Sequence, residues 1–310
     1  MKRTTDRRTF LKAGLAAGAA AVIGKRGIPG LIASGTDEAA DIAVVRGTDI
    51  LANTAKAVDL AGGMARLIPK GGRIGLLINA PAWWKLPGSH VNTDIVLSTI
   101  RMCLDAGAGE IMFLLEPSPD IWKRSPLSAK YDAEIKAVRK CTGNYVETGI
   151  KGGLALKKAS VIKELLECDA FIDVSIGKNH EGTNFSGCLK NYMGACRGET
   201  NHFFHSGQGK GKGGYEDVDY LSQCIADVNL LRRPALSIAD ATTVLATNGP
   251  AGPGELKRFD KIVVGRDPVA VDAYCAGLLG HAPGEIAMLK KAAAHGLGRM
   301  DLVGLRVREA

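Results

Sequence analysis

The stretch that decides the fold runs from Cys168 to Gly194 and reads CDAFIDVSIGKNHEGTNFSGCLKNYMG. Its apolar part, Ala170 to Ile176, ends at Gly177, and a short apolar run bounded by glycine predicts a buried strand. Polar residues follow at once, and Ser186 to Ala195 predicts a short helix. Ligands in parallel α/β sheets bind at the carboxyl ends of strands. The polar residues after Gly177 are therefore predicted to form a ligand site.

Two residues of this stretch are candidate catalytic groups. His180 is of the type that moves protons near neutral pH. Lys190 lies among glycines and apolar residues, where a lysine can lose its proton and act as a nucleophile or a covalent tether. The candidate ligand-binding residues are Lys178, Asn179, Thr183, Asn184, Asn191, Asp240, Asn248 and Gly249. The alternative is an exposed polar loop with solvated lysines.

The first half of the chain alternates between strand and helix patterns. The predicted elements are Ile42–Val45, Thr48–Ile68, Arg73–Ile78, Thr93–Ala106 and Glu110–Leu115. This alternation predicts an α/β fold of Rossmann-like type, with a mainly parallel sheet, right-handed crossovers and helices on both faces.

The second half continues the same pattern. Helices are predicted at Lys130–Cys141, Ala159–Glu167, Glu216–Leu231 and Pro283–His295, and strands at Ala235–Ala239, Lys261–Gly265 and Leu302–Val307. Asp240 ends one of these strands and is therefore placed for a ligand hydroxyl or a metal. Asp267 followed by Pro268 predicts a helix start, and Asp272 lies five residues further on, where it could face the site.

The segment Asn201–Tyr215 is rich in glycine and lysine. It predicts either a basic lid over an anionic group or a flexible linker. His202 and His205 stand at its start and are candidate metal ligands, since imidazole binds transition metals, with ordinary surface histidines as the alternative.

The leader carries most of the net charge. The chain has a formal charge of +8, and residues 1–36 hold seven basic residues and one acidic residue, which leaves +2 for residues 37–310. A nucleic-acid partner is therefore not expected. Asp6-Arg7-Arg8-Thr9-Phe10-Leu11-Lys12, followed by a short apolar run, resembles a twin-arginine export motif. We expect residues 1–36 to be a signal peptide, residues 37–310 to be one domain, the twin-arginine translocase to be a partner, and the location to be periplasmic or extracytoplasmic.

None of the seven cysteines belongs to a Cys-x-x-Cys pair. Iron–sulfur and structural zinc sites usually show this spacing, so no integral iron–sulfur motif is expected. An odd number of cysteines without a pattern specifies no disulfide.

Three motifs resemble the domain-of-unknown-function family numbered 362. They are Lys178-Asn179-His180 with Thr183 and Leu189-Lys190-Asn191, then Asn248-Gly249-Pro250, and then Arg266-Asp267-Pro268-Val269-Ala270-Val271-Asp272. The resemblance covers Asp41 to Val303 and implies no established chemistry. Many members carry an added Cys-x-x-Cys module that this chain lacks, so an iron–sulfur protein would be a separate partner.

A more distant resemblance is to the nickel-pincer-nucleotide lactate racemases. It rests on the order of His180, a glycine-rich turn, Lys190 and the later His205. The resemblance implies that a lysine tethers the cofactor, a later histidine binds nickel and an upstream histidine handles protons. The residue directly after Glu116 is not a histidine, although that family keeps a second proton-transfer histidine at this point.

The sequence thus predicts an exported protein that acts on a small anionic substrate with a metal or an organic cofactor, such as a transition metal or a nickel-containing cofactor. The alternative is a periplasmic protein that binds a ligand or a metal, or assists redox chemistry, without turnover.

Overall fold

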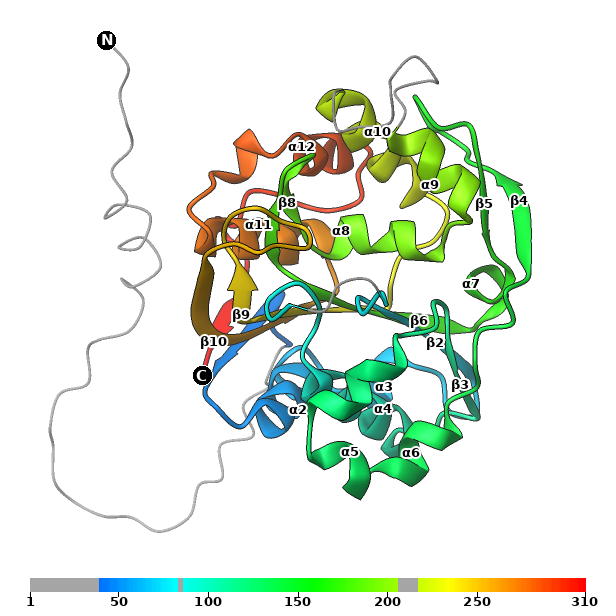
Figure 1. Ribbon diagram of the computed structural model, residues 1–310, viewed down its shortest axis with the longest axis vertical. Helices are drawn as coiled ribbons and strands as arrows, with labels where there is room; N and C mark the ends of the chain where they lie inside the picture. The colour runs from blue at the N-terminus through cyan, green and yellow to red at the C-terminus, as the bar shows by residue number, and fades with distance from the viewer. Residues whose placement is uncertain (1–38, 83–85, 206–216) are drawn as a thin grey trace, which may run out of the picture. The chain divides into compact units, whose positions relative to one another are not determined.

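The computed structural model describes residues 39–82, 86–205 and 217–310, which build a seven-stranded sheet flanked by helices (Figure 1). The strands stand in the order β11-β1-β10-β9-β6-β2-β3. Their bounds are β1 Ile42–Arg46, β2 Arg73–Ile78, β3 Glu110–Phe113, β6 Ala170–Ile176, β9 Leu236–Leu245, β10 Leu256–Gly265 and β11 Val307–Glu309.

Neighbouring strands of this sheet are parallel except at β10. Strand β2 pairs in parallel with β3 and β6, β6 with β9, and β1 with β11, whereas β10 is antiparallel to both β1 and β9. The reversal follows from the connection between β9 and β10, because residues 246–255 form a loop without the helix that a parallel crossover needs. The predicted α/β fold with a mainly parallel sheet is confirmed.

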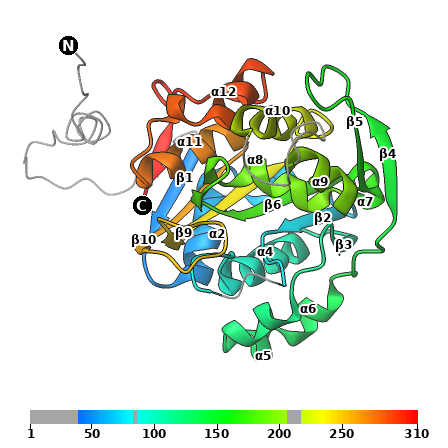
Figure 2. The ribbon, with the colours of Figure 1, turned by 45° about the horizontal axis from the view of Figure 1, so that its top comes forward.

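Helices cover both faces of the sheet (Figures 1 and 2). One face carries α2 Ile50–Leu60, α3 Met64–Leu67, α4 Thr93–Asp105, α5 Leu127–Lys130 and α6 Asp132–Ala137, and the other carries α8 Cys188–Asn191, α9 Gly198–His205, α10 Val218–Val228, α11 Pro268–Leu278 and α12 Ala287–Ala294. A hydrophobic core lies on each face of the sheet. Successive side chains of β2 point to opposite faces, so Leu77 packs in the core under α8 to α12, and Leu76 and Ile78 pack in the core under α2 and α4.

The segment Ala159–Glu167 was predicted as one helix, and this is wrong. Lys158–Ile162 forms strand β5, which pairs with β4 (Tyr145–Gly149), and α7 spans only Lys163–Glu167. Val161 and Ile162 are β-branched, and such residues lose side-chain freedom in a helix. Both are fully buried in the strand.

The long helix predicted over Thr48–Ile68 is broken into α2 and α3. Gly62 and Gly63 separate them with φ angles of 116° and 81°, which lie outside the helical region. Other predicted elements differ in their bounds: the helix at Lys130–Cys141 is α5 and α6, the helix at Pro283–His295 begins as a 3-10 helix at Pro283–Glu285, and the closing strand lies at Val307–Glu309.

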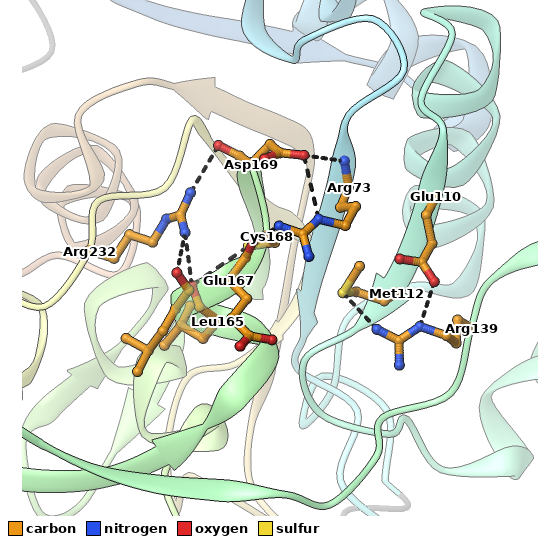
Figure 3. Close-up of polar contacts among 10 residues, drawn as sticks. Arg73, Glu110, Met112, Arg139, Leu165, Glu167, Cys168, Asp169 and Arg232 are labelled. Carbon is orange, nitrogen blue, oxygen red and sulfur yellow. Dashed lines mark hydrogen bonds and ion pairs between the residues drawn. The ribbon is translucent and has the colours of Figure 1, made fainter.

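At the amino ends of the parallel strands, three arginines have hydrogen-bond partners within the protein (Figure 3). The Nε of Arg139 donates to Glu110 Oε1 at 2.6 Å, and the backbone N–H of Arg73 donates to Asp169 Oδ2 at 2.7 Å. The guanidinium of Arg232 donates to the carbonyl oxygens of Leu165, Leu166 and Asp169. These contacts hold the end of α7 against the sheet.

None of the helices within residues 39–82, 86–205 and 217–310 is both long and apolar enough to cross a membrane.

Candidate functional site

The central motif leaves the sheet as a small, largely buried hairpin and not as the exposed polar loop that was the alternative interpretation. Strand β7 (Lys178–His180) pairs antiparallel with β8 (Asn184–Ser186) directly after β6. Gly177 joins β6 to β7, and a Cβ there would lie 2.8 Å from the Cβ of Cys275 on α11. The glycine therefore lets the hairpin pack closely over α11 at the carboxyl edge of the sheet.

The 248–254 loop is clamped onto this hairpin by Asn179 and Gly249. The backbone N–H of Gly249 donates to Asn179 Oδ1 at 3.0 Å, and the N–H of Glu181 donates to the Gly249 carbonyl oxygen at 3.0 Å. A Cβ on Gly249 would lie 1.8 Å from the Asn179 carbonyl oxygen, so only glycine fits. Asn248, with φ of 52°, donates its amide to the Pro253 carbonyl oxygen at 3.1 Å. Ligand roles for these residues stay predictions.

Lys178 is fully buried and joins three segments. Its Nζ donates to the carbonyl oxygens of Ser89 and, at 2.9 Å, Pro250. Burial, followed by the nearby charge of Lys190, lowers the pKa of Lys178 to about 6. Lys178 is therefore mostly uncharged at pH 7 in the ligand-free protein and holds the two loops to the hairpin through carbonyl groups.

His180 is a neutral hydrogen-bond donor in this site. Its Nδ1 accepts the N–H of Gly182 at 3.0 Å, which assigns the ring proton to Nε2. Burial, with the charges of Lys190, Lys178 and His205, lowers the pKa of His180 to about 2. The imidazole therefore remains uncharged throughout the neutral range.

Lys190 lies on α8, half-buried, and its surroundings are unlike those of Lys178. Its Nζ donates to the thioether sulfur of Met193 at 3.5 Å and forms no ion pair with any carboxylate of the described residues. Thioether sulfur is a weak acceptor. Burial lowers the pKa of Lys190 to about 8, so its ammonium is mostly charged at pH 7.

Helix α8 is held in place by the buried carboxylate of Asp272. Its two oxygens accept the backbone N–H groups of Cys188 at 2.7 Å and Leu189 at 3.0 Å. A Cβ on Gly187 would lie 2.2 Å from Asp272 Oδ1, so glycine is needed for this approach. Burial raises the pKa of Asp272 to about 7. The carboxylate positions the helix that carries Lys190.

Asn191 connects α8 to two strands. Its amide nitrogen donates to Asp173 Oδ1 at 2.6 Å and to the Leu77 carbonyl oxygen at 3.1 Å, and its oxygen accepts from Asn79 Nδ2 at 2.9 Å. The side chain is buried and joins β2, β6 and α8. These are structural contacts, and a ligand contact for Asn191 stays a prediction. Oδ1 of Asn79 is buried with no hydrogen-bond partner among the described residues.

The turn of the hairpin places Thr183 inward and Asn184 outward. Thr183 is buried, and its hydroxyl donates to the Phe185 carbonyl oxygen at 2.8 Å. Asn184 is exposed with φ of 62°, a left-handed conformation that asparagine tolerates. Both residues shape the turn, and ligand contacts for them also stay predictions.

Asp240 does not end its strand, in contrast to the prediction. Strand β9 continues to Leu245, and Asp240 lies within it opposite Ile176 of β6. Its carboxylate accepts the N–H of Asn92 at 2.7 Å and the N–H and hydroxyl of Thr242 at 2.8 and 2.7 Å. Buried Asp240 therefore anchors the start of α4 through Asn92, which is a structural task.

His205 lies at the end of α9, so the predicted loop at Asn201–Tyr215 begins as a helix. The rest of that predicted loop, residues 206–216, lies outside the described residues. The Nδ1 of His205 is 2.7 Å from the Asn201 carbonyl oxygen, so Nδ1 carries the ring proton and donates to that oxygen. Burial and the charge of Lys190 lower the pKa of His205.

A metal would find few ligands here. Within residues 39–82, 86–205 and 217–310, no three His, Cys, Asp or Glu side chains are grouped so as to hold a metal ion. His205 could offer its Nε2, but the Nε2 of His180 carries a proton and His202 is exposed. The described donor set does not fit a metal centre, and the metal role of His202 and His205 stays a prediction.

His90 is a member of the site that sequence reasoning missed. It is half-buried, and burial together with the charges of Arg124 and Lys178 lowers its pKa. The preceding Ser89 supplies a carbonyl oxygen to Lys178. The sequence signal that could have identified it is Gly88-Ser89-His90, a glycine followed by two polar residues in the segment after β2. Strand β2 lies beside β6 in the sheet, so the segment after β2 lies at the same carboxyl edge.

The carboxyl edge thus gathers basic side chains from four segments. The charges that shift the pKa of His180 are those of Lys190, Lys178 and His205, and Lys190 also lowers the pKa of the other two. The charge of Lys190 disfavours the protonated forms of its basic neighbours, and a bound anion would offset that repulsion. Within the described residues, the arrangement is suited to an anion beside Lys190.

Comparison with known proteins bears on the family and on export. Residues 75–277 match the family described as a domain of unknown function, DUF362, and residues 4–24 match the signal sequence of the twin-arginine translocation pathway. Both predicted resemblances are confirmed. No curated protein matches the chain.

Among solved structures, a crystal structure of a Thermotoga maritima protein from a structural genomics consortium is similar. It has 16% sequence identity and a TM-score of 0.42, and the match covers 76% of this chain and 60% of that one. The chain thus spans less than two thirds of that protein, and this likeness carries no argument about function.

Proposed function

The chain belongs to the DUF362 family, and we propose that it is an exported protein that binds a small anionic substrate beside Lys190 and acts on it with Lys190 and His180. The twin-arginine signal sequence directs the chain across the cytoplasmic membrane through the translocase. The periplasm or extracytoplasmic space is the proposed place of work.

The observation that carries this proposal is the state of Lys190. Its ammonium is half-buried, mostly charged at pH 7 and bonded only to a thioether within the described residues. A charged group in a poorly solvated place without a counter-charge is costly. A carboxylate or phosphate from a ligand would supply the missing charge and stronger hydrogen bonds.

His180 has a separate proposed task. Its Nδ1 accepts the Gly182 N–H, so the ring proton is on Nε2. A neutral imidazole with a depressed pKa polarises a substrate oxygen by hydrogen bonding without carrying charge itself. Lys190 would attract the anion, and His180 would bind the oxygen on which charge develops.

A metal or organic cofactor is the less supported part of the predicted function. The described donors do not form a metal centre, so no step is assigned to a metal. A separate iron–sulfur partner and a nickel-containing cofactor stay predictions.

The test is calorimetric titration of the exported chain with acetate, pyruvate and phosphate, followed by assays for turnover of any anion that binds. Lys190→Met should weaken binding by about ten- to a hundredfold, because a charge-assisted hydrogen bond contributes about 1.5–3 kcal/mol. The matched control is Lys136→Met, which removes an exposed lysine paired with Asp132. Equal binding by wild type and Lys190→Met would rule the proposal out.

A further inference from the structure

Lys190 has a depressed pKa, which is a property that an anion site alone does not need. Its pKa of about 8 leaves roughly a tenth of the amine unprotonated at pH 7. An ordinary solvated lysine with a pKa near 10.5 has about three-hundredfold less free amine at that pH. A lysine that served only as a fixed positive charge would gain nothing from this depression.

We propose that Lys190 forms an imine with the carbonyl carbon of a small 2-oxo acid. This inference rests on the proposed function, since the carboxylate of such a substrate is the anion that the site is proposed to bind. A 2-oxo acid also carries an electrophilic carbon next to that carboxylate. The inference therefore narrows the substrate class from anions in general to anions with an adjacent carbonyl.

Geometry supports Lys190 as the nucleophile in preference to Lys178. The Nζ of Lys178 is fully buried and donates to the Ser89 and Pro250 carbonyl oxygens, which tie down two loops. The Nζ of Lys190 is bound only by the Met193 sulfur within the described residues, and its side chain reaches solvent. Its lone pair is free to attack once the proton leaves.

The position of Lys190 is fixed by the fold. Helix α8 is held at its start by Asp272, and the next residue, Asn191, is bonded to β2 and β6. The backbone on which the amine stands is thus anchored from both directions. A nucleophile held in one place meets a bound carbonyl at a high effective concentration.

The reaction balances without an oxidant or a reductant. The lone pair of Nζ forms a bond to the carbonyl carbon, and the π electrons of the carbonyl move to its oxygen. A proton passes from nitrogen to that oxygen, which gives a neutral carbinolamine. Protonation of the hydroxyl and loss of one water then give a protonated imine, next to the substrate carboxylate.

The neighbouring basic groups have defined parts in this step. The Nε2–H of His180 donates to the carbonyl oxygen and stabilises the charge that develops there. A bound carboxylate raises the pKa of Lys178 and His205, because an opposite charge favours their protonated forms. Their positive charge would then hold the carboxylate while Lys190 is neutral.

The experiment traps the imine on the exported full-length domain. The protein is incubated with pyruvate and cyanoborohydride, and intact mass and peptide mapping locate any adduct. We expect a single adduct at Lys190 with the mass of pyruvic acid plus two hydrogens minus one water. The rate of adduct formation at Lys190 should exceed that at an ordinary solvated lysine by about three-hundredfold, the ratio of their free-amine fractions at pH 7.

Lys190→Arg is the sharpest variant because arginine keeps the positive charge but is never a free amine in this range. Acetate binding by this variant should fall by less than about tenfold, whereas the adduct should disappear. Trapping should also become faster as pH rises from 7 to 8, because the free-amine fraction of Lys190 rises from about a tenth to about half at its pKa of about 8.

The outcomes separate the inference from the proposed function. If pyruvate and acetate bind but no adduct forms at Lys190, or adducts spread evenly over surface lysines, the imine is excluded and the anion site stands. If neither anion binds, both proposals fail. An adduct that maps to Lys178 would also overturn the assignment to Lys190.

Discussion

The two edges of the sheet are both rich in basic residues, but they use them differently. At the amino edge, Arg139 binds Glu110, Arg73 lies near Asp169, and Arg232 donates to three backbone carbonyl oxygens (Figure 3). At the carboxyl edge, Lys190 has only the Met193 sulfur among the described residues. Cations with protein partners stabilise the fold, and a cation without a counter-charge points to a ligand.

The carboxylates of the two edges differ in the same way. Asp169 is exposed and lies beside an arginine, whereas Asp272 and Asp240 are buried and bind backbone N–H groups. At the carboxyl edge these acids are therefore used to hold helices α8 and α4. Both carboxyl groups are therefore engaged with the backbone, and neither pairs with the ammonium of Lys190.

The largest effect is expected from Asp272→Ala. It leaves the buried N–H groups of Cys188 and Leu189 without an acceptor, and each such loss costs about 1–3 kcal/mol. We expect the free energy of unfolding to fall by roughly 3 kcal/mol in urea titration. The control is Asp301→Ala, an exposed residue that accepts one N–H, from Val303. Equal losses in the two variants would mean that Asp272 is not the anchor of α8.

Lys190→Met should come next and should affect binding rather than folding. Removal of the ammonium should weaken anion binding by about ten- to a hundredfold, as one charge-assisted hydrogen bond is lost. Stability should stay level or rise slightly, since an unpaired, poorly solvated charge is removed. Arg232→Met at the amino edge should leave the affinity unaltered. An equal fall in anion affinity in Lys190→Met and Arg232→Met would show that the two edges of the sheet do not differ in anion binding.

Arg232→Ala should have the opposite profile. Its guanidinium donates to the carbonyl oxygens of Leu165, Leu166 and Asp169, around the end of α7. We expect the free energy of unfolding to fall by about 1–2 kcal/mol, read from thermal and urea denaturation. The anion affinity of Arg232→Ala, measured by calorimetry on the same sample, should equal that of the wild type. A variant as stable as the wild type would show that the contacts at this edge are dispensable.

The pH dependence of binding should follow Lys190. Its pKa of about 8 means that the cation is present below pH 8 and is lost above it. Anion affinity should therefore be level at lower pH and fall by up to about tenfold for each unit above pH 8. Titration at several pH values would test this, with Lys190→Arg keeping its affinity to higher pH. An affinity that is unchanged from pH 7 to 10 would exclude Lys190 as the binding cation.

The smallest effect is expected from Asp169→Asn at the amino edge. The Asp169 and Arg73 side chains are about half exposed, and the Nε–Oδ2 distance is 3.7 Å. Exposed ion pairs of this kind contribute about 0–1 kcal/mol and are screened by salt. We expect a stability change within 1 kcal/mol that vanishes at high salt. A larger fall in the free energy of unfolding that does not depend on salt would show that Asp169 stabilises the protein mainly through the hydrogen bond from the Arg73 backbone N–H to its Oδ2.

Much of the fold was predictable from local sequence. Arg73–Ile78 and Ala170–Ile176 were predicted with the bounds that β2 and β6 have, because uninterrupted apolar runs of this length identify buried parallel strands. Asp267 caps α11 as expected, since a cap depends on residues two or three positions away. The twin-arginine motif and the family motifs are likewise read from neighbouring residues.

The contacts that decide the site were not predictable, because they join residues far apart in the chain. Asp272 reaches Cys188 across 84 positions, Gly249 reaches Asn179 across 70, and Asp240 reaches Asn92 across 148. The sequence identified His180 and Lys190 as candidate catalytic groups and Lys178 as a candidate ligand-binding residue, but it did not indicate their charge states. Their burial, their partners and therefore their different pKa shifts depend on which segments the sheet brings together. The sequence alone determined most of the strands, the Asp267 helix cap and the export signal, whereas tertiary packing decided that Lys190 has no carboxylate partner among the described residues.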